Sequence, residues 1–140
     1  RACVEEAIGQ YPFRRFEREK VHVKVDEEFE FLGESSLLVY VLFNLLKNAL
    51  YSLESAGKGA IHIELEKHKH RNYLIFEDTG LGIEEDVLPL IFDGFFTTRS
   101  NGTGAGLAFC KRTLRGFGGD IRVSSKLGQF TRFTLEFPLI

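Results

Sequence analysis

The 140-residue sequence has few cysteines, no basic excess and no long apolar run. Cys3 and Cys110 stand far apart, so neither a disulfide framework nor a zinc-binding spacing is present, and a reducing, cytoplasmic compartment is expected. The formal net charge of −2 argues against a nucleic-acid groove binder. The apolar run at 37–43 is far shorter than the roughly 20 residues that span a bilayer, so no membrane segment is expected.

Two further absences concern the chain start and the histidines. The sequence does not open with methionine and has no signal peptide, so it is expected to be a segment of a larger protein. Its four histidines follow no metal-ligand pattern, and the pair His68 and His70 fits a solvated turn better than a metal site.

The pattern of apolar residues predicts one domain over 1–140 with interspersed helices and strands. Most strands pair as hairpins, which predicts a two-layer α/β sandwich: one mixed, mostly antiparallel sheet with about three helices on one face. The expected helices are 2–10, 34–55, 84–92 and 107–117, and the expected strands are 21–25, 28–32, 60–68, 72–78, 120–125 and 130–137. Gly57 and Gly59 are expected to end the long helix, and 93–106 is expected to be a loop.

The long helix carries two asparagines, Asn44 and Asn48, within the apolar stretch LFNLLKNAL. Residues four apart lie on the same helix face, so the two amides are stacked. Burying an amide without a partner costs roughly 1–3 kcal/mol. Either protein groups satisfy these amides, which is common, or they face a ligand.

Two glycine-containing turns are the other candidate sites. EDTGLGI places Asp78 at a strand end before Gly80 and Gly82, where a carboxylate can accept from an exocyclic amine; an ordinary turn is the alternative. NGTGAGLAF places alternating glycines before a helix, whose first N–H groups suit phosphate; a flexible loop is the alternative. The P-loop pattern is absent, and the Rossmann pattern requires a strand before the glycines and a different spacing.

In order along the chain, these motifs resemble the ATP-binding catalytic domain of bacterial sensor histidine kinases, within the superfamily shared with gyrase, MutL and the heat-shock chaperone ATPases. FNLLKNAL is similar to the N box, DTGLG to the G1 box, IFDGFFTT to the F box and GTGAGL to the G2 box. The likeness covers the chain from about residue 21 to its end. NLLKNALYSL is also similar to the same segment of autoinducer-sensing hybrid kinases.

The resemblance implies a role for each motif residue. Asn48 would be a ligand of the Mg²⁺ on the ATP phosphates, with Asn44 beside it, and an amide oxygen suits this ion. Asp78 would bind the adenine amino group. Gly80 and Gly82 would let the base lie close. Phosphate contacts are implied for Gly102, Thr103, Gly104, Gly106 and Leu107; Thr131 is implied at the nucleotide; Lys47 would reach phosphate or else be a solvated lysine. The F-box residues Phe92, Phe95 and Phe96 would anchor a lid, or would simply pack in the core.

The sequence departs from the family pattern at four positions without losing an essential group. Tyr51 stands where a Lys or Arg is frequent, which puts one phosphate contact in doubt; Ala105 replaces Leu in the G2 box; Phe117 and Phe130 replace a common His and Gly.

Position 44 separates the possible activities. The hydrolytic relatives carry a Glu there as general base, and an asparagine cannot take a proton at neutral pH. The expected function is therefore transfer of the γ-phosphoryl group of ATP to a histidine. No histidine here lies in an H-box sequence, so the acceptor is expected on a separate dimerisation domain of a homodimeric kinase that passes the group to a response regulator. The alternative is a binding module without chemistry.

Overall fold

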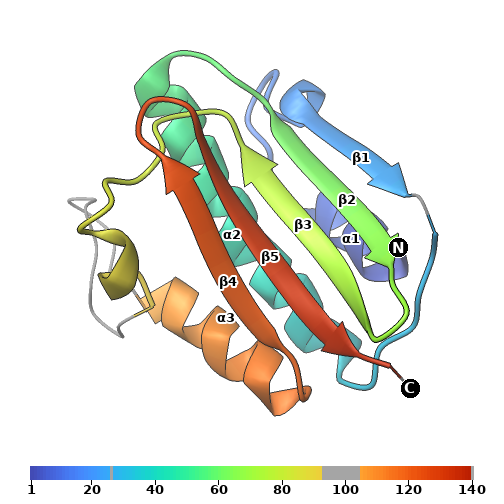
Figure 1. The fold of residues 1–140 in the computed structure, drawn as a ribbon. Coiled ribbons are helices and arrows are strands. Elements are labelled where there is room, and N and C mark those ends of the chain that lie inside the picture. The colour runs from blue at the N-terminus through green and yellow to red at the C-terminus, as the bar shows by residue number, and fades with distance from the viewer. Residues whose placement is uncertain (26, 93–104, 140) are drawn as a thin grey trace.

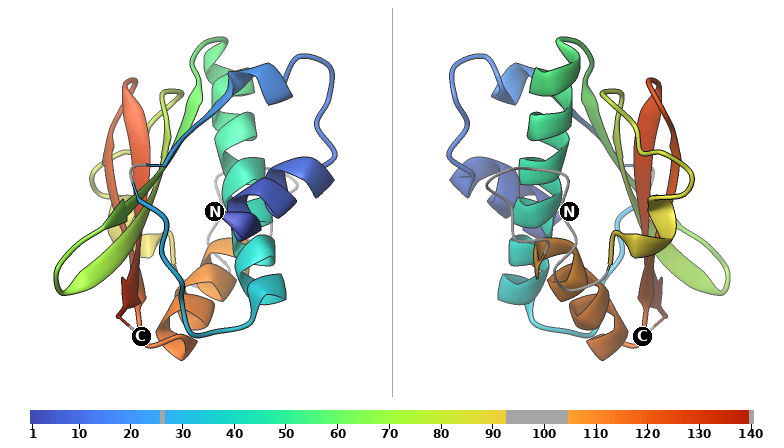
Figure 2. Two further views of the ribbon diagram at one scale, coloured as in Figure 1. Left: turned by 90° about the vertical axis from the view of Figure 1, so that its right-hand side faces the viewer. Right: turned by 90° about the vertical axis from the view of Figure 1, so that its left-hand side faces the viewer.

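The computed structural model describes residues 1–25, 27–92 and 105–139, which fold into two layers. A five-stranded sheet forms one layer, and the helices cover one of its faces (Figures 1 and 2). The helices are α1 (Ala2–Gln10), α2 (Ser35–Ala56) and α3 (Ala105–Gly116), with short 3₁₀ turns η1 (Arg18–Lys20) and η2 (Leu88–Leu90). The strands are β1 (Val21–Val25), β2 (Ile61–Lys67), β3 (Arg71–Asp78), β4 (Asp120–Lys126) and β5 (Phe130–Pro138).

The sheet is mixed, as the sequence predicted. Its strand order is β1-β2-β3-β5-β4. Only β1 and β2 run parallel, whereas β2–β3, β3–β5 and β4–β5 are antiparallel. The predicted α/β sandwich is confirmed.

Alternation in the strands and the long apolar face of α2 build the core between the layers. In β3, Leu74 and Phe76 point toward the helices and are buried, and Asp78 continues the same face. Nine side chains of α2 are buried against the sheet and its neighbours. Its length and mean hydropathy of 1.4 would also allow a membrane crossing, a test that the core helix of a soluble protein passes equally.

The C-terminal end of α2 is set by glycine, as predicted. Gly57 adopts a left-handed φ of 69°, and its N–H donates to the Leu53 and Glu54 carbonyls at 2.9 and 3.2 Å. A residue with a Cβ is strained in this conformation. Glycine therefore lets the chain leave the helix while the last carbonyls stay hydrogen-bonded.

Two predicted elements are wrong. Residues 28–32 are not a strand: Phe29 and Phe31 instead pack their rings on Phe137 at 5.5 and 5.4 Å, covering the end of the sandwich. Residues 84–92 contain only the 3₁₀ turn η2, because Pro89 stands in that turn and has no N–H to continue an α-helix. The predicted 93–106 loop lies mostly outside the described residues, and its last two residues belong to α3.

Candidate functional site

One face of α2 carries a row of polar side chains one turn apart. Asn44, Asn48 and Ser52 are spaced by four residues, so successive members lie about 6 Å apart along the axis. The amide nitrogen Nδ2 of Asn44 donates to the Tyr40 carbonyl at 3.0 Å, which satisfies half of that amide within the helix. Asn48 is half-buried, and its side chain makes no hydrogen bond to a described residue. The Asn48 amide is therefore the more available of the two for a ligand.

The start of α3 lies directly against this row. A Cβ built on Gly106 would stand 2.5 Å from Asn44 Oδ1, closer than real contacts allow. The first turn of α3 therefore packs closely on the amide, and a larger residue at 106 would require the Asn44 side chain to shift. The bare N–H groups and the positive dipole end of α3 are thus brought beside the asparagines.

Asp78 ends β3 in the middle of the sheet. Its register partners are Ile61 on β2 and Thr131 on β5, and its side chain is only 4% exposed. Two donors reach the same oxygen: the Ser52 hydroxyl and the Gly80 N–H each lie 3.0 Å from Oδ1. Burial raises the pKa of the Asp78 carboxyl to about 6, although the hydrogen bonds from Gly80 and Ser52 oppose that rise.

The turn after Asp78 is fastened to α2 on one side. The Leu81 N–H donates to Ser52 Oγ at 2.8 Å. A Cβ on Gly80 would lie 2.5 Å from Ser52 Oγ and 2.8 Å from the Ser52 carbonyl group, so the turn rests on the helix backbone itself.

The same turn is fastened to the β4–β5 hairpin on its other side. The Ile83 N–H donates to Ser125 Oγ at 2.7 Å, and the Ser125 hydroxyl donates to the Phe130 carbonyl at 2.6 Å. Gly82 has φ 71°, and a Cβ there would lie 2.3 Å from the Lys126 carbonyl oxygen. Thr131, 5% exposed, lies 3.2 Å from Ser125 through the two hydroxyls. The turn is therefore held from both layers.

The structure brings most of the predicted residues together. Gly106 lies against Asn44, Asn48 follows one turn later on α2, and Ser52, a further turn on, is hydrogen-bonded to Asp78. Thr131 is the strand neighbour of Asp78. Leu107 is half-buried against the core, and Lys47 is exposed one residue before Asn48. Gly102, Thr103 and Gly104 lie outside the described residues, as do Phe95 and Phe96.

Phe92 supports the packing alternative. Its ring lies 6.3 Å from that of Phe133 on β5, and Lys111 Nζ stands 5.0 Å above it. Phe92 therefore packs on the helix-facing side of the sheet.

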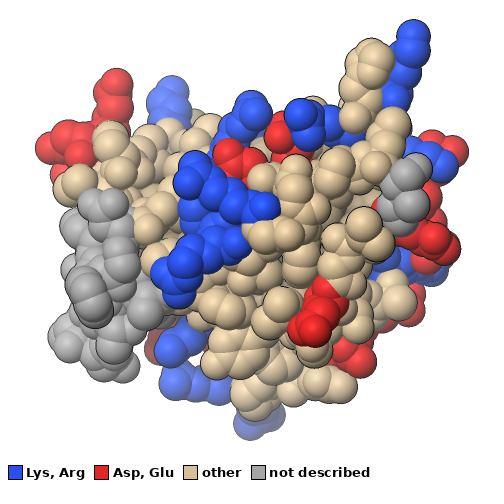
Figure 3. All heavy atoms as spheres, turned by 90° about the horizontal axis from the view of Figure 1, so that it is seen from below, with Lys and Arg blue, Asp and Glu red and all other residues tan. Residues whose placement is uncertain are grey.

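Basic side chains gather on the underside of the molecule, away from the end of β3 at which Asp78 lies (Figure 1). Seen from below, Lys and Arg side chains form one patch on this face (Figure 3). On α3, Lys111 and Arg115 are paired with Asp120 at 2.9 and 3.5 Å, while Arg112 is exposed.

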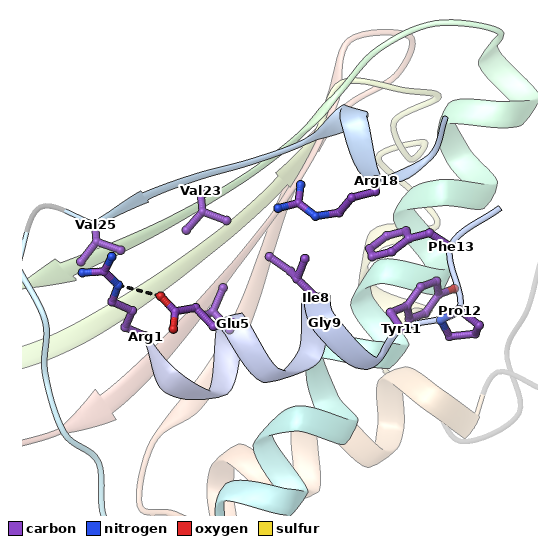
Figure 4. A pocket seen from close by; sticks show the side chains of 11 residues that line it. Arg1, Glu5, Ile8, Gly9, Tyr11, Pro12, Phe13, Arg18, Val23 and Val25 are labelled. Carbon is purple, nitrogen blue, oxygen red and sulfur yellow. Dashed lines mark hydrogen bonds and ion pairs between the residues drawn. The ribbon is translucent and has the colours of Figure 1, made fainter. Parts of the chain in front are cut away.

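A separate hollow of about 870 Å³ lies between α1 and β1 (Figure 4). Ile8, Val23 and Val25 form part of its apolar wall, and the Arg1–Glu5 ion pair lies at its rim. None of the predicted site residues lines it, so it is not a candidate for the nucleotide.

Sequence reasoning missed two residues that hold the site. Ser52 continues the spacing of Asn44 and Asn48, and this i, i+4 repeat was the available signal. Ser125 had none, because a serine in a strand does not reveal a bond to a distant turn.

Comparison with known proteins places this geometry in a family. The chain is 39% identical over 143 residues to the autoinducer 1 sensor kinase/phosphatase LuxN of Vibrio harveyi, covering 99% of this chain and 16% of LuxN. It is 38% identical over 137 residues to the CAI-1 autoinducer sensor kinase/phosphatase CqsS of Vibrio cholerae, covering 96% of this chain and 20% of CqsS. The chain thus spans under a quarter of these relatives.

Solved structures agree on the fold. The catalytic domain of histidine kinase ThkA superposes with a TM-score of 0.81 at 24% identity, covering 98% of this chain and 90% of that one.

The profile described as histidine kinase-, DNA gyrase B- and HSP90-like ATPase matches residues 33–140, which include the α2 row, the Asp78 turn and α3. The assignment made from the four motifs is therefore confirmed, and the chain belongs to the histidine kinase-, DNA gyrase B- and HSP90-like ATPase family.

Proposed function

We propose that this chain is the catalytic part of a sensor histidine kinase, which holds Mg·ATP and donates its γ-phosphoryl group to a histidine on a separate dimerisation domain. The observation that carries the proposal is the row on α2. Asn44 and Asn48 stand near the start of α3, and Ser52, one turn on, is bonded to Asp78. One helix thus fixes a phosphate end and a base end of a nucleotide site.

At the base end, the proposed contact is Asp78. A carboxylate oxygen is an acceptor for the exocyclic amine of adenine, and guanine presents a carbonyl oxygen at that position instead. Gly80 and Gly82, which the surrounding backbone forbids to carry a Cβ, leave the turn free of side chains at these two points. Thr131 lies beside Asp78 and offers a hydroxyl to the same ligand.

At the phosphate end, the donor set fits a magnesium ion. Amide oxygen is a suitable hard ligand, so Asn48 is the proposed protein ligand, with Asn44 beside it. The close approach of Gly106 to Asn44 gives the α3 N–H groups access to the same space. When bound, Mg²⁺ supplies charge neutralisation on the phosphate oxygens. Lys47 and the glycines at 102 and 104 complete the proposed phosphate contacts.

Phosphoryl transfer is favoured over hydrolysis by the residue at position 44. Hydrolysis needs a base that takes a proton from water, and the Asn44 amide cannot do so. Its Nδ2 is committed to the Tyr40 carbonyl, and its Oδ1 lies against Gly106. An acceptor imidazole is itself a nucleophile and does not require that base.

The rival function is a nucleotide-binding module that performs no chemistry. The buried, twice-bonded Asp78 and the glycine contacts argue against degeneration of the site. Direct binding of ATP followed by transfer to an added acceptor distinguishes the two functions.

The proposal extends to the partners and location of the whole protein. These are a phosphoacceptor domain in a homodimer, a response regulator downstream, and a place as the cytoplasmic part of a membrane-bound sensor. The support is the naming of LuxN and CqsS as sensor kinase/phosphatases.

The test is transfer of label from γ-labelled ATP to the dimerisation domain of the same kinase, a helical hairpin that carries the acceptor histidine. The hairpin is supplied as a separate protein or on the same chain. We expect acid-labile phosphohistidine on the hairpin, none with Asn48→Ala, and very slow phosphate release by the chain alone. Brisk phosphate release without the hairpin would mean an ATPase and overturn the kinase assignment.

A further inference from the structure

We propose that Ser52 is a positioning residue of the nucleotide site, whose hydroxyl turns the Asp78 carboxylate so that Oδ2 faces the exocyclic amine of adenine. This inference rests on the proposed function, because it takes Asp78 as the adenine contact. It assigns a task to a serine that no motif indicated.

The direction of the Ser52 hydroxyl follows from its two partners. Leu81 can only donate through its N–H, so at 2.8 Å it occupies an acceptor position of Ser52 Oγ. An ionised Asp78 can only accept, so the single Ser52 proton points to Oδ1 at 3.0 Å. The hydroxyl is therefore oriented by the backbone of the turn that it also holds.

The two donors to the Asp78 carboxylate from the described part of the chain reach the same oxygen. The Gly80 N–H and the Ser52 hydroxyl converge on Oδ1, each at 3.0 Å. Among the described residues, none donates a hydrogen bond to Asp78 Oδ2. Of the two carboxylate oxygens, Oδ2 is therefore the one left for a ligand.

Close packing gives this arrangement little freedom. The turn at Gly80 approaches the Ser52 backbone so closely that a Cβ would stand 2.8 Å from its carbonyl group. The neighbours of Asp78 on β2 and β5, Ile61 and Thr131, carry no charge. Among the residues that the structure describes, Glu77 is the ionisable neighbour that acts on Asp78. Ser52 is therefore the side-chain group that sets the carboxylate's orientation.

The same hydroxyl favours the ionised carboxylate. Because a donated hydrogen bond lowers the pKa that burial has raised, removal of the hydroxyl moves the pKa of Asp78 further up. The loss also leaves the Gly80 N–H as the remaining described donor to Oδ1, so the carboxylate is held less firmly and discriminates less between an amine and a carbonyl on the base.

The experiment measures ATP and inosine triphosphate affinity by calorimetry for the parent chain and Ser52→Ala across pH 5 to 8. Inosine presents a carbonyl oxygen where adenine has its amine. We expect Ser52→Ala to bind ATP about fivefold more weakly at pH 7.5, as for one lost hydrogen bond, with inosine triphosphate affinity unchanged. The midpoint of the pH dependence of ATP affinity should move upward in Ser52→Ala. Protonation of the nucleotide itself affects both proteins equally, so it does not contribute to this difference.

The matched control is Ser55→Ala, the same change at an exposed site of α2, which should behave as the parent. If Ser52→Ala unfolds, Ser52→Cys keeps the volume with a weak donor and should show the same changes. Unchanged ATP affinity overturns the proposal. Equal weakening for both nucleotides with an unmoved pH midpoint also overturns it, because that result marks a purely structural serine.

A failure of the proposed function looks different. If Asp78→Asn binds ATP like the parent, Asp78 is not the adenine contact and the proposed function fails, whatever Ser52→Ala does. Asp78→Asn that loses ATP while Ser52→Ala behaves as the parent leaves the contact in place and overturns only the role of Ser52.

Discussion

Replacing Asp78 by Asn should stabilise the fold above pH 6 although it damages the site. The carboxyl is 4% exposed, and burial raises its pKa from an ordinary 3.8 to about 6. A carboxyl with a raised folded-state pKa binds its proton more tightly when folded. Its contribution therefore favours folding at low pH and is lost as pH rises from about 4 to about 6.

The size of the effect follows from the same numbers. A difference of roughly two pKa units at about 1.4 kcal/mol each gives about 3 kcal/mol of destabilisation by ionised Asp78 above pH 6. Asparagine removes this destabilisation and can leave Oδ1 in place to accept from Ser52 and Gly80. Only the atom at Oδ2 changes, from an acceptor to a donor.

Urea unfolding of parent and variant at pH 4 and pH 8 measures the effect. We expect Asp78→Asn to be more stable than the parent by about 3 kcal/mol at pH 8 and by well under half of that at pH 4. Asp86→Asn, at an exposed carboxylate, controls for the loss of a negative charge. An advantage that is the same at both pH values would refute the desolvation argument.

Three further predictions concern the site and its glycines. Asp78→Asn should lower ATP affinity at least tenfold, because a charge-assisted bond worth roughly 1.5–3 kcal/mol is lost; calorimetry on a folded variant that shows parental affinity would contradict this. In Asn48→Ala, Mg²⁺ should no longer strengthen ATP binding while adenosine binding barely changes; a preserved magnesium effect would remove Asn48 from the metal site. Gly80→Ala should destabilise the fold by about 1–3 kcal/mol through overlap with Ser52, whereas Gly116→Ala, with open space around its Cβ, should be neutral or slightly stabilising; equal denaturation midpoints would contradict the contact.

The sequence predicted elements whose periodicity was long and unambiguous. The structure confirms the α2 helix, the two hairpins and the helix end at Gly57. These could be predicted because residue type alone indicates which positions are buried and which adopt a turn conformation. The segment 28–32 shows the limit. Alternation records which side chains are buried, but Phe29 and Phe31 reach burial by covering the sandwich end, without pairing in the sheet.

The motifs of the candidate site could be predicted from the sequence, but the hydrogen bonds that hold them in place could not. Asn48, Asp78 and Gly106 are recognisable because their residue types and spacing are unusual for a core. Ser125 is not, because its bonds to Ile83 and Phe130 depend on how the β4–β5 hairpin lies against a turn some forty residues away. Such tertiary hydrogen bonds depend on the assembled fold, not on local propensity.

The turn after Asp78 is held by serine hydroxyls from both layers, which has a consequence for the timing of nucleotide capture. The amides of Leu81 and Ile83 are bonded to Ser52 and Ser125, so these loop amides should exchange with solvent as slowly as those of a strand. At the proposed base end, an incoming base meets a surface that is already ordered, so binding there costs little conformational entropy. We therefore expect the base to bind first and its covalent link to hold the phosphates near α2 and α3.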